Sequence, residues 1–383
     1  MKVFSLLSVA ALTTCLSASG FSEEGNPSKM NSSESRYETI ISQQTGNGYN
    51  NDYSSSNQMK NSQNGNTVRN SSHGCIDQGF SFQAEFLWWR AVLDNLEYAI
   101  PISGTVSNSQ RTTGAYDITG EFRHPKFSFD PGVRLSLGYD FGASNWDVFA
   151  RWTYHSSDDR DSTTGGLGVI PLKDFYVQSG SQVFATAQSA KAKWENEINI
   201  ADLEMGYNYF FSDRFSFRPY FGLKASWIDM EYNITYGDVA ILGTTGALNV
   251  AAVDIRNKTN WWGVGPEVGM DGYLHIGWGF SLYGRVSGAL MYGPYDNSFH
   301  EPDTNANSIA LKSNNNYRQR AMSQLLIGLE WAKCFSNNIL FALNIGWEGQ
   351  YWWNQHGMRM IFDNQPSGDL TLTGLDVGMR LGF

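Results

Sequence analysis

The sequence is poor in charge and has no long hydrophobic run. Charged residues make up 17% of the 383 residues, whereas soluble globular proteins average about 25%. Basic residues number 27 against 37 acidic ones and form no basic run, so nucleic acid is not an expected partner. No stretch after the N-terminus has the roughly 18 uninterrupted apolar residues of a spanning helix. A membrane location therefore requires a β-barrel.

Motifs that carry enzyme chemistry are also missing. We find no Gly-rich phosphate loop, no His/Cys metal spacing and no Gly-x-Ser-x-Gly turn. The six histidines are scattered singly, and only His155, close to Asp158 and Asp159, suggests the outer rim of a barrel protease. That spacing has no mechanism-specific signature. We therefore expect no enzymatic activity, catalytic residue, cofactor or metal ligand.

The N-terminal part divides into two segments. A basic start at Met1 and Lys2, an apolar run over 3–16 and small residues over 17–20 predict a signal peptide over 1–20. Ser, Asn, Gln and Gly dominate the next segment, which has too few apolar residues to form a core. We interpret residues 21–78 as a disordered arm in the periplasm.

From Gly79 onward, apolar residues recur with a period of two, the pattern of a β-strand with one apolar face. The segment 127–139 is the clearest case, because apolar residues alternate with small or charged ones along its whole length. The same alternation predicts ten strands, at 80–90, 127–139, 146–155, 202–209, 215–227, 262–274, 280–292, 321–331, 339–351 and 375–383.

The connections between these strands alternate in length. Long connections span 100–123, 156–193, 230–258, 293–317 and 354–368, and short ones span 141–145, 211–214, 275–277 and 332–338. Short periplasmic turns and long extracellular loops are typical of outer-membrane barrels. We therefore predict an all-β transmembrane antiparallel barrel over 79–383; a soluble all-β sandwich is the alternative. A hairpin over 175–184 would raise the strand count to twelve.

Aromatic residues favour the barrel. Tryptophans fall at both ends of the predicted strands, as in the aromatic girdles of a bilayer-spanning barrel. Those at the long-loop ends are Trp88, Trp89, Trp152, Trp227, Trp261, Trp262, Trp352 and Trp353, and those at the short-turn ends are Trp146, Trp278 and Trp331. The last strand carries Leu375, Val377, Met379, Leu381 and Phe383 on one face. This alternation up to a final Phe looks like the signal read by the barrel-insertion machinery.

Several blocks resemble a known family. They are 82–89 (FQAEFLWW), 93–99 (LDNLEYA), 131–139 (PGVRLSLGY), 146–153 (WDVFARWT), 218–224 (RPYFGLK) and 262–266 (WGVGP). In this order they resemble the Legionella-type major outer membrane protein family, which is also found in chlamydia-related bacteria. The resemblance covers residues 79–383 and implies a pore-forming outer-membrane barrel.

The charged residues of the strands share the face opposite the apolar one. Charge on a lipid face is costly, about 2–4 kcal/mol for Arg or Lys at the midplane, so we expect these side chains to line the lumen. They are Glu85, Asp130, Arg134, Asp147, Arg151, Asp202, Glu204, Arg218, Lys224, Glu267, Asp271, Arg285, Glu330, Glu348, Asp376 and Arg380. Acidic residues predominate, which predicts a mildly cation-selective pore for small hydrophilic solutes. The alternative is a closed barrel acting as a surface-exposed structural protein or adhesin.

Two cysteines remain after a signal peptide carrying Cys15 is removed. Cys75 precedes the first strand and Cys334 lies in a short turn, so both face the oxidising periplasm. We expect a disulfide between them; two free thiols, or bridges between molecules of the envelope as the resemblance suggests, are alternatives. Other expected partners are outer-membrane lipid, lipopolysaccharide and a second copy of the chain.

Overall fold

The computed structural model describes residues 78–103, 119–173, 184–243, 246–302, 308–335, 339–358 and 368–383. All of them belong to the second of two compact units, residues 70–383. The predicted signal peptide and the predicted arm, apart from Gln78, lie outside the described residues. Within the described ranges, no helix is both long enough and apolar enough to span a membrane.

Thirteen strands make up the described part of this unit. They are β1 (Gly79–Leu93), β2 (Ala99–Ser103), β3 (Thr119–Gly120), β4 (Asp130–Asp140), β5 (Trp146–Pro171), β6 (Phe184–Tyr207), β7 (Tyr209–Phe210), β8 (Phe215–Gly243), β9 (Gly246–Gly277), β10 (Phe280–Pro302), β11 (Ser308–Phe335), β12 (Ile339–Trp352) and β13 (Leu370–Gly382). One short 3₁₀ helix, Gly142–Ser144, forms the turn before β5.

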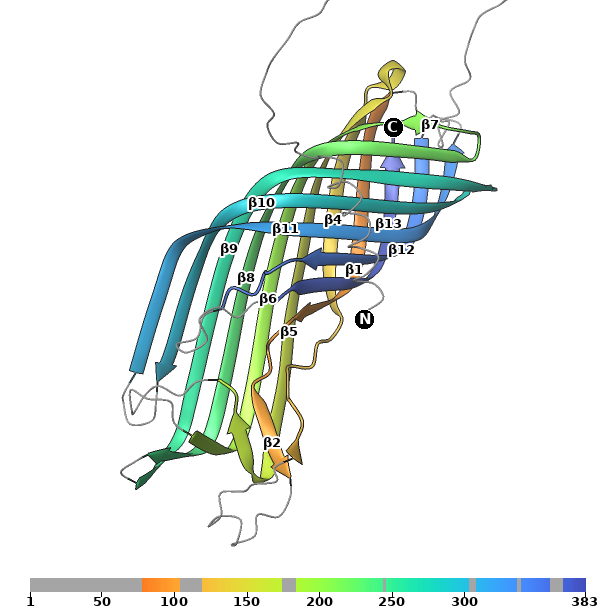
Figure 1. The fold of residues 1–383 in the computed structure, drawn as a ribbon. Coiled ribbons are helices and arrows are strands. Elements are labelled where there is room, and N and C mark those ends of the chain that lie inside the picture. The colour runs from red at the N-terminus through yellow and green to blue at the C-terminus, as the bar shows by residue number, and fades with distance from the viewer. Residues whose placement is uncertain are drawn as a thin grey trace, which may run out of the picture. The chain divides into compact units, whose positions relative to one another are not determined.

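Ten of these strands close a ring (Figure 1). The order is β1, β13, β12, β11, β10, β9, β8, β6, β5 and β4, and β4 pairs with β1. Every pairing is antiparallel, and the first and last strands meet from Ser81↔Gly382 to Leu93↔Leu370. The predicted antiparallel barrel is confirmed. β5 and β6 pair directly with each other, so the ring has ten strands among the described residues. The alternative hairpin over 175–184 lies outside them except for Phe184.

The outer face of the ring is apolar across a belt at the short-turn end. Large apolar side chains such as Phe86, Leu137, Phe221, Val268 and Ile327 are 51–63% exposed there. Their neighbours along each strand point inward, because successive side chains of a strand lie on opposite faces. Water-facing strands do not carry such a belt, whereas lipid-facing strands must. The belt therefore marks the membrane-spanning part of the barrel.

Six strands continue far beyond this belt. We call these continuations the extension. It consists of residues 156–171, 184–198, 228–243, 246–261, 293–302 and 308–317, which belong to β5, β6, β8, β9, β10 and β11. Figure 1 shows these long strands reaching well past β1, β4, β12 and β13. Three of the connections expected as long loops, 156–193, 230–258 and 293–317, are thus mostly β-hairpins.

The missed hairpins have a physical cause, which β8 shows. Up to Trp227 its apolar side chains point outward, and from Ile228 the inward positions are apolar instead. Met230, Tyr232 and Ile234 are 1% exposed, while Asp229 points outward into solvent. The period of two continues but its phase reverses, because the strand leaves lipid and enters water. A search for one continuous apolar face therefore ends at Trp227.

The inner face of the extension is a hydrophobic core. Segments that follow the short strands fold against it: Leu96 and Tyr98 after β1, Phe127 before β4, and Met358 after β12. We call residues 94–103 and 119–129 the β1–β4 link, of which β2 pairs with the far end of β5. Tyr232 and Tyr236 donate hydrogen bonds from their hydroxyls to the carbonyls of Leu96 and Tyr98, at 2.6 and 2.5 Å. The link is therefore anchored inside the extension.

The prediction of two aromatic bands is only partly correct. Trp88, Trp152, Trp227 and Trp262 are 42–47% exposed at the far edge of the apolar belt. Their sequence neighbours Trp89 and Trp261, and likewise Trp352, are at most 2% exposed and point inward. Two adjacent residues of a strand cannot share a face, so each Trp-Trp pair contributes one ring to the band and one to the core.

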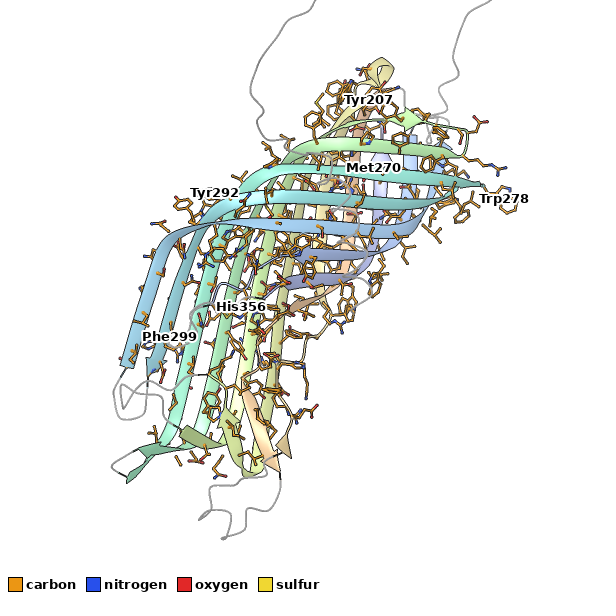
Figure 2. All side chains as sticks on the ribbon, viewed as in Figure 1. Tyr207, Met270, Trp278, Tyr292, Phe299 and His356 are labelled. Atoms are coloured by element: carbon orange, nitrogen blue, oxygen red, sulfur yellow. The ribbon has the colours of Figure 1, made fainter. Side chains whose placement is uncertain are left out.

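At the short-turn end, tight turns join consecutive strands. Trp278, 97% exposed, lies at the tip of the β9–β10 turn, and Met270 and Tyr292 mark the outer face (Figure 2). The turn needs positive φ at three consecutive residues, 128° at Gly277, 53° at Trp278 and 85° at Gly279. Glycine reaches that region without strain, which explains the pair flanking Trp278. The strand pairing continues through 275–277, where a turn was expected.

Candidate functional site: the charged lumen

The sixteen charged residues predicted to face the lumen lie at inward positions of the ring. Fifteen belong to the membrane-spanning part, and the sixteenth, Asp130, begins β4 at its far edge and is half-buried. Glu204 and Asp376 are fully buried, and Glu348 is 1% exposed. Charge at such depth is stable only when it is paired or hydrogen-bonded. The pairs fall into three groups.

Arg134 organises the first group from β4. Its Nη1 lies 2.9 Å from Asp376 and 3.2 Å from Glu85, and its Nη2 lies 2.9 Å from Glu348. These three carboxylates come from β13, β1 and β12, so one guanidinium joins four consecutive strands of the ring. Gln324 and Gln350 each donate a further hydrogen bond of 2.7 Å to Glu348.

Glu204 on β6 is the centre of the second group. Three arginines contact its carboxylate: Arg151 at 2.6 Å, Arg285 at 3.1 Å and Arg218 at 3.4 Å. Arg218 also binds Asp147 at 2.6 Å, and both Arg218 and Arg285 bind Asp271. Three positive charges thus share three carboxylates from β5, β6 and β9.

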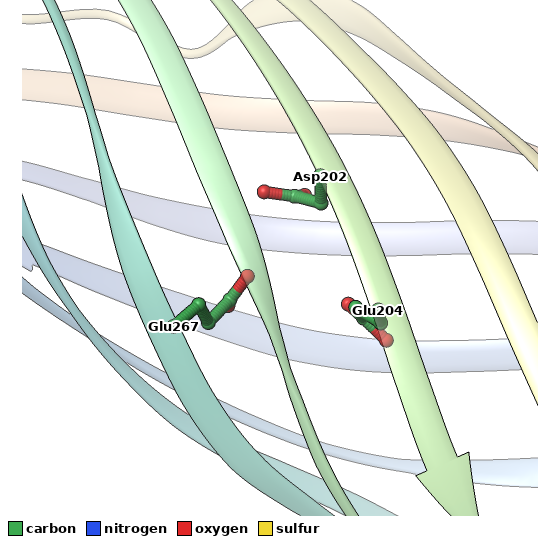
Figure 3. A group of neighbouring side chains, drawn as sticks. All are labelled: Asp202, Glu204 and Glu267. Carbon is green, nitrogen blue, oxygen red and sulfur yellow. The ribbon is translucent and has the colours of Figure 1, made fainter.

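Lys224 completes this group beside a triad of carboxylates. Asp202, Glu204 and Glu267 each place an oxygen within 4.8 Å of the other two (Figure 3). Carboxylate oxygens are suitable ligands for a hard cation. The Lys224 ammonium lies 2.5 Å from Asp202 and 3.3 Å from Glu267, and the arginines cover Glu204. The protein's own cations therefore already balance this triad.

The third group is the pair Arg380 and Glu330, 3.1 Å apart, near the short-turn end. With it, all six predicted basic residues have carboxylate partners. The predicted set contains ten acidic residues, from Glu85 to Asp376, and six basic ones, so the set keeps a net charge of −4 (6 − 10). In this formal count the carboxyl groups outnumber the basic side chains on the inward face.

Polar and aromatic lumen residues accompany the charges and were not predicted. Tyr220 lies under two guanidinium groups, with Arg218 5.2 Å and Arg285 5.1 Å from its ring centre. Asn344 donates hydrogen bonds to Glu85 and Tyr283, both at 3.3 Å. Strand parity could have identified them, because Tyr220 shares its face with Arg218 and Tyr283 shares its face with Arg285.

The residues that suggested a protease lie on different faces of β5. His155 and Asp159 point inward and are 0% and 1% exposed, whereas Asp158 points outward and pairs with Arg160 and Lys193. Burial raises the pKa of the Asp159 carboxyl, opposed by hydrogen bonds from Ser128. Hydrogen bonds from Arg160 lower the pKa of Asp158. That the protein is not an enzyme stays a prediction.

Two further predicted features lie outside the lumen. Leu375, Val377, Met379, Leu381 and Phe383 share the outward face of the last strand, and an insertion signal there stays a prediction. Cys334 lies near the end of β11 and is disulfide-bonded. Its pairing with Cys75 stays a prediction, because Cys75 lies outside the described residues.

Comparison with known proteins gives a family but no near relative. Residues 72–383 match the family model described as Legionella pneumophila major outer membrane protein precursor. No curated protein matches the chain.

Solved structures of outer-membrane proteins are similar only at a low level. The outer membrane protease OmpT from Escherichia coli is 10% identical, with 80% of this chain and 98% of that chain covered and a TM-score of 0.39. A major outer membrane protein from Thermus thermophilus is 11% identical, with 80% and 99% covered and a TM-score of 0.31. The Pseudomonas putida toluene transporter TodX is 7% identical, with 79% and 89% covered and a TM-score of 0.25. Likenesses at this level add nothing to the fold described above.

Proposed function

The chain belongs to the family of the Legionella pneumophila major outer membrane protein, and on that premise we propose that this outer-membrane barrel is a narrow channel for small hydrophilic solutes, with a preference for cations. The observation that carries the proposal is the chemistry of the lumen, where fifteen charged side chains face inward within the apolar belt.

Stability alone does not account for that lumen. A ten-stranded ring is only slightly wider than eight-stranded barrels, which side chains can fill. Apolar side chains would fill it at no loss of stability, because replacing buried ion pairs by packed hydrophobic residues is often neutral or stabilising by about 1–4 kcal/mol. A charged lumen is instead what a water-filled path requires. The excess of carboxylates would concentrate cations there.

A second function has its own support. Arg134, Arg218 and Lys224 are at most 6% exposed and fully paired, and the extension beyond them is filled by a hydrophobic core. A barrel closed in this way would serve as a structural protein that presents the extension at the cell surface. The two functions make opposite predictions about ion flow.

Planar-bilayer recording of the purified barrel separates them. A channel gives discrete conductance steps, and in a salt gradient its reversal potential indicates a preference for cations. Conductance with anion preference would contradict the role of the carboxylates. A complete lack of conductance steps from correctly folded protein would favour the closed structural barrel. Folding is checked independently by the heat-dependent shift in electrophoretic mobility.

A further inference from the structure

One strand of the extension differs from its neighbours. The inward residues of β6, β8 and β9 in the extension are mostly apolar, as Ile198, Tyr232 and Ile255 illustrate. The inward positions of β5 are polar without interruption from the charged lumen to Thr163, about midway along the extension. These positions, which we call the β5 stripe, are Arg151, Thr153, His155, Ser157, Asp159, Asp161 and Thr163.

Several polar atoms on and beside the β5 stripe are buried without a hydrogen-bond partner among the described residues. They include Ser157 Oγ and Asp159 Oδ2 on β5, and both amide atoms of Asn196 and the indole nitrogen of Trp194 on β6. Asn196 pairs across the ladder with Ser157, and Trp194 with Asp159, so these groups form one continuous patch. All four side chains belong to residues at most 3% exposed.

These buried polar atoms need hydrogen-bond partners that the described residues do not supply. Buried polar groups in folded proteins are nearly always hydrogen-bonded, and each unpaired group costs about 1–3 kcal/mol. Two neighbouring strand positions with several such atoms therefore indicate that water or a polar solute contacts this face of β5. A purely structural core would place apolar residues there, as β8 does with Met230 and Tyr232.

The β1–β4 link covers the β5 stripe through a small number of contacts. Ser128 donates from its backbone N–H and its hydroxyl to Asp159 Oδ1, at 2.7 and 3.0 Å. The Tyr98 hydroxyl donates to Asp161 at 2.9 Å, and the Lys126 ammonium, which is largely exposed, lies 3.2 Å from the same carboxylate. Nearly all of these partners are carboxylates, whose hydrogen bonds water or a cation can replace. Ser128 and Lys126 can thus leave the stripe and expose only polar positions of β5 there.

We propose that solute crosses the extension along the inner face of β5, between the β5 stripe and the β1–β4 link, and that the solutes it admits are small hydrated cations. Asp159 and Asp161 supply the negative charge, while Ser157 and Asn196 replace part of the hydration shell. The path is continuous with the charged lumen through Thr153 and Arg151. This inference rests on the proposed channel function.

The test uses matched cysteine variants probed with a cationic methanethiosulfonate reagent during bilayer recording. Ser157→Cys lies on the stripe, and Met230→Cys lies in the same row of the barrel, because Asn196 pairs with both positions. The two residues are 3% and 1% exposed, so static burial does not distinguish them. We expect the reagent to remove most of the conductance of Ser157→Cys and to leave Met230→Cys unchanged.

A second matched pair covers the case in which one variant fails to fold. Thr163→Cys lies at the outer end of the stripe, and Ala190→Cys is its cross-strand neighbour on β6. The path along β5 would be overturned if both stripe variants still conducted after the reagent. It would also be overturned if the reagent blocked the stripe and control variants equally. If the unmodified protein does not conduct, the proposed channel function fails first, so the two failures are distinguishable.

Discussion

Arg285 on β10 reaches Glu204 on β6 across two intervening strands, with Nη1 3.1 Å from Oε1. The contact does not follow the barrel wall but crosses the inside of the ring. It joins two residues 81 positions apart in the sequence. Cross-lumen pairs of this kind determine how much of the lumen is open, because the side chains that bind each other also occupy the space.

Glu204→Gln should destabilise the barrel and weaken its preference for cations. The variant removes the charge that three arginines share, which leaves buried positive charge less compensated, at a cost of about 3–5 kcal/mol. The midpoint of urea unfolding in micelles and the reversal potential in a salt gradient measure the two effects.

Glu195→Gln is the matched control for that prediction. Glu195 pairs with Lys193 on the outer face of the extension, where both side chains are at least one third exposed. Exposed pairs contribute little, so neither the unfolding midpoint nor the reversal potential should change. A Glu204→Gln barrel as stable as the Glu195→Gln barrel would contradict a central role for Glu204.

Tyr98→Phe should loosen the β1–β4 link without affecting the membrane-spanning part. Burial, and the hydrogen bond to Asp161, raise the pKa of the Tyr98 phenol, so it remains a donor at physiological pH. Losing this bond to a charged acceptor costs about 2 kcal/mol. Hydrogen exchange of residues 94–103 should accelerate, while exchange in β12 and β13 stays the same. Tyr209→Phe, at the opposite end of the barrel, is the control.

The segment around His356 should open as the pH falls. Burial, together with Lys173, lowers the pKa of His356 from 6.5 to about 4. The opened segment therefore binds more protons than the native one between these values, and the native form loses about 3 kcal/mol as the pH falls from 6.5 to 4. The backbone N–H of His356, which donates to Gly368 at 3.0 Å, reports this opening by hydrogen exchange.

His356→Gln should remove most of that pH dependence, because an amide does not titrate in this range. The same replacement of the exposed His124 should leave the pH dependence of exchange at position 356 intact. Exchange at position 356 that has the same pH dependence with and without the imidazole would show that another group controls the opening.

Cys75 and Cys334 should form an intramolecular disulfide at the periplasmic end. Non-reducing electrophoresis of isolated outer membranes should show a monomer whose mobility changes on reduction. Cys75→Ser should release a free thiol at Cys334 that a maleimide reagent labels. A ladder of reducible oligomers would instead indicate bridges between molecules, and full labelling of both thiols in the unmodified protein would exclude any disulfide between them.

The membrane-spanning part of the barrel could be predicted from the sequence. A strand places alternate side chains on opposite faces, and lipid on one side excludes charge from that face. Residues such as Val377 and Asp376 are therefore assigned to lipid and lumen by parity alone, and the number of such segments gives the ten strands. No knowledge of which strands face each other is needed.

Only the tertiary structure decided the rest. Ile228 and Met230 point inward because the strand leaves the bilayer at Trp227, so the apolar positions change face there. Arg134 and Asp376, 242 residues apart, bind because ring closure brings β4 and β13 to either side of β1. Such partners depend on the tilt and closure of the whole ring, which local alternation does not encode.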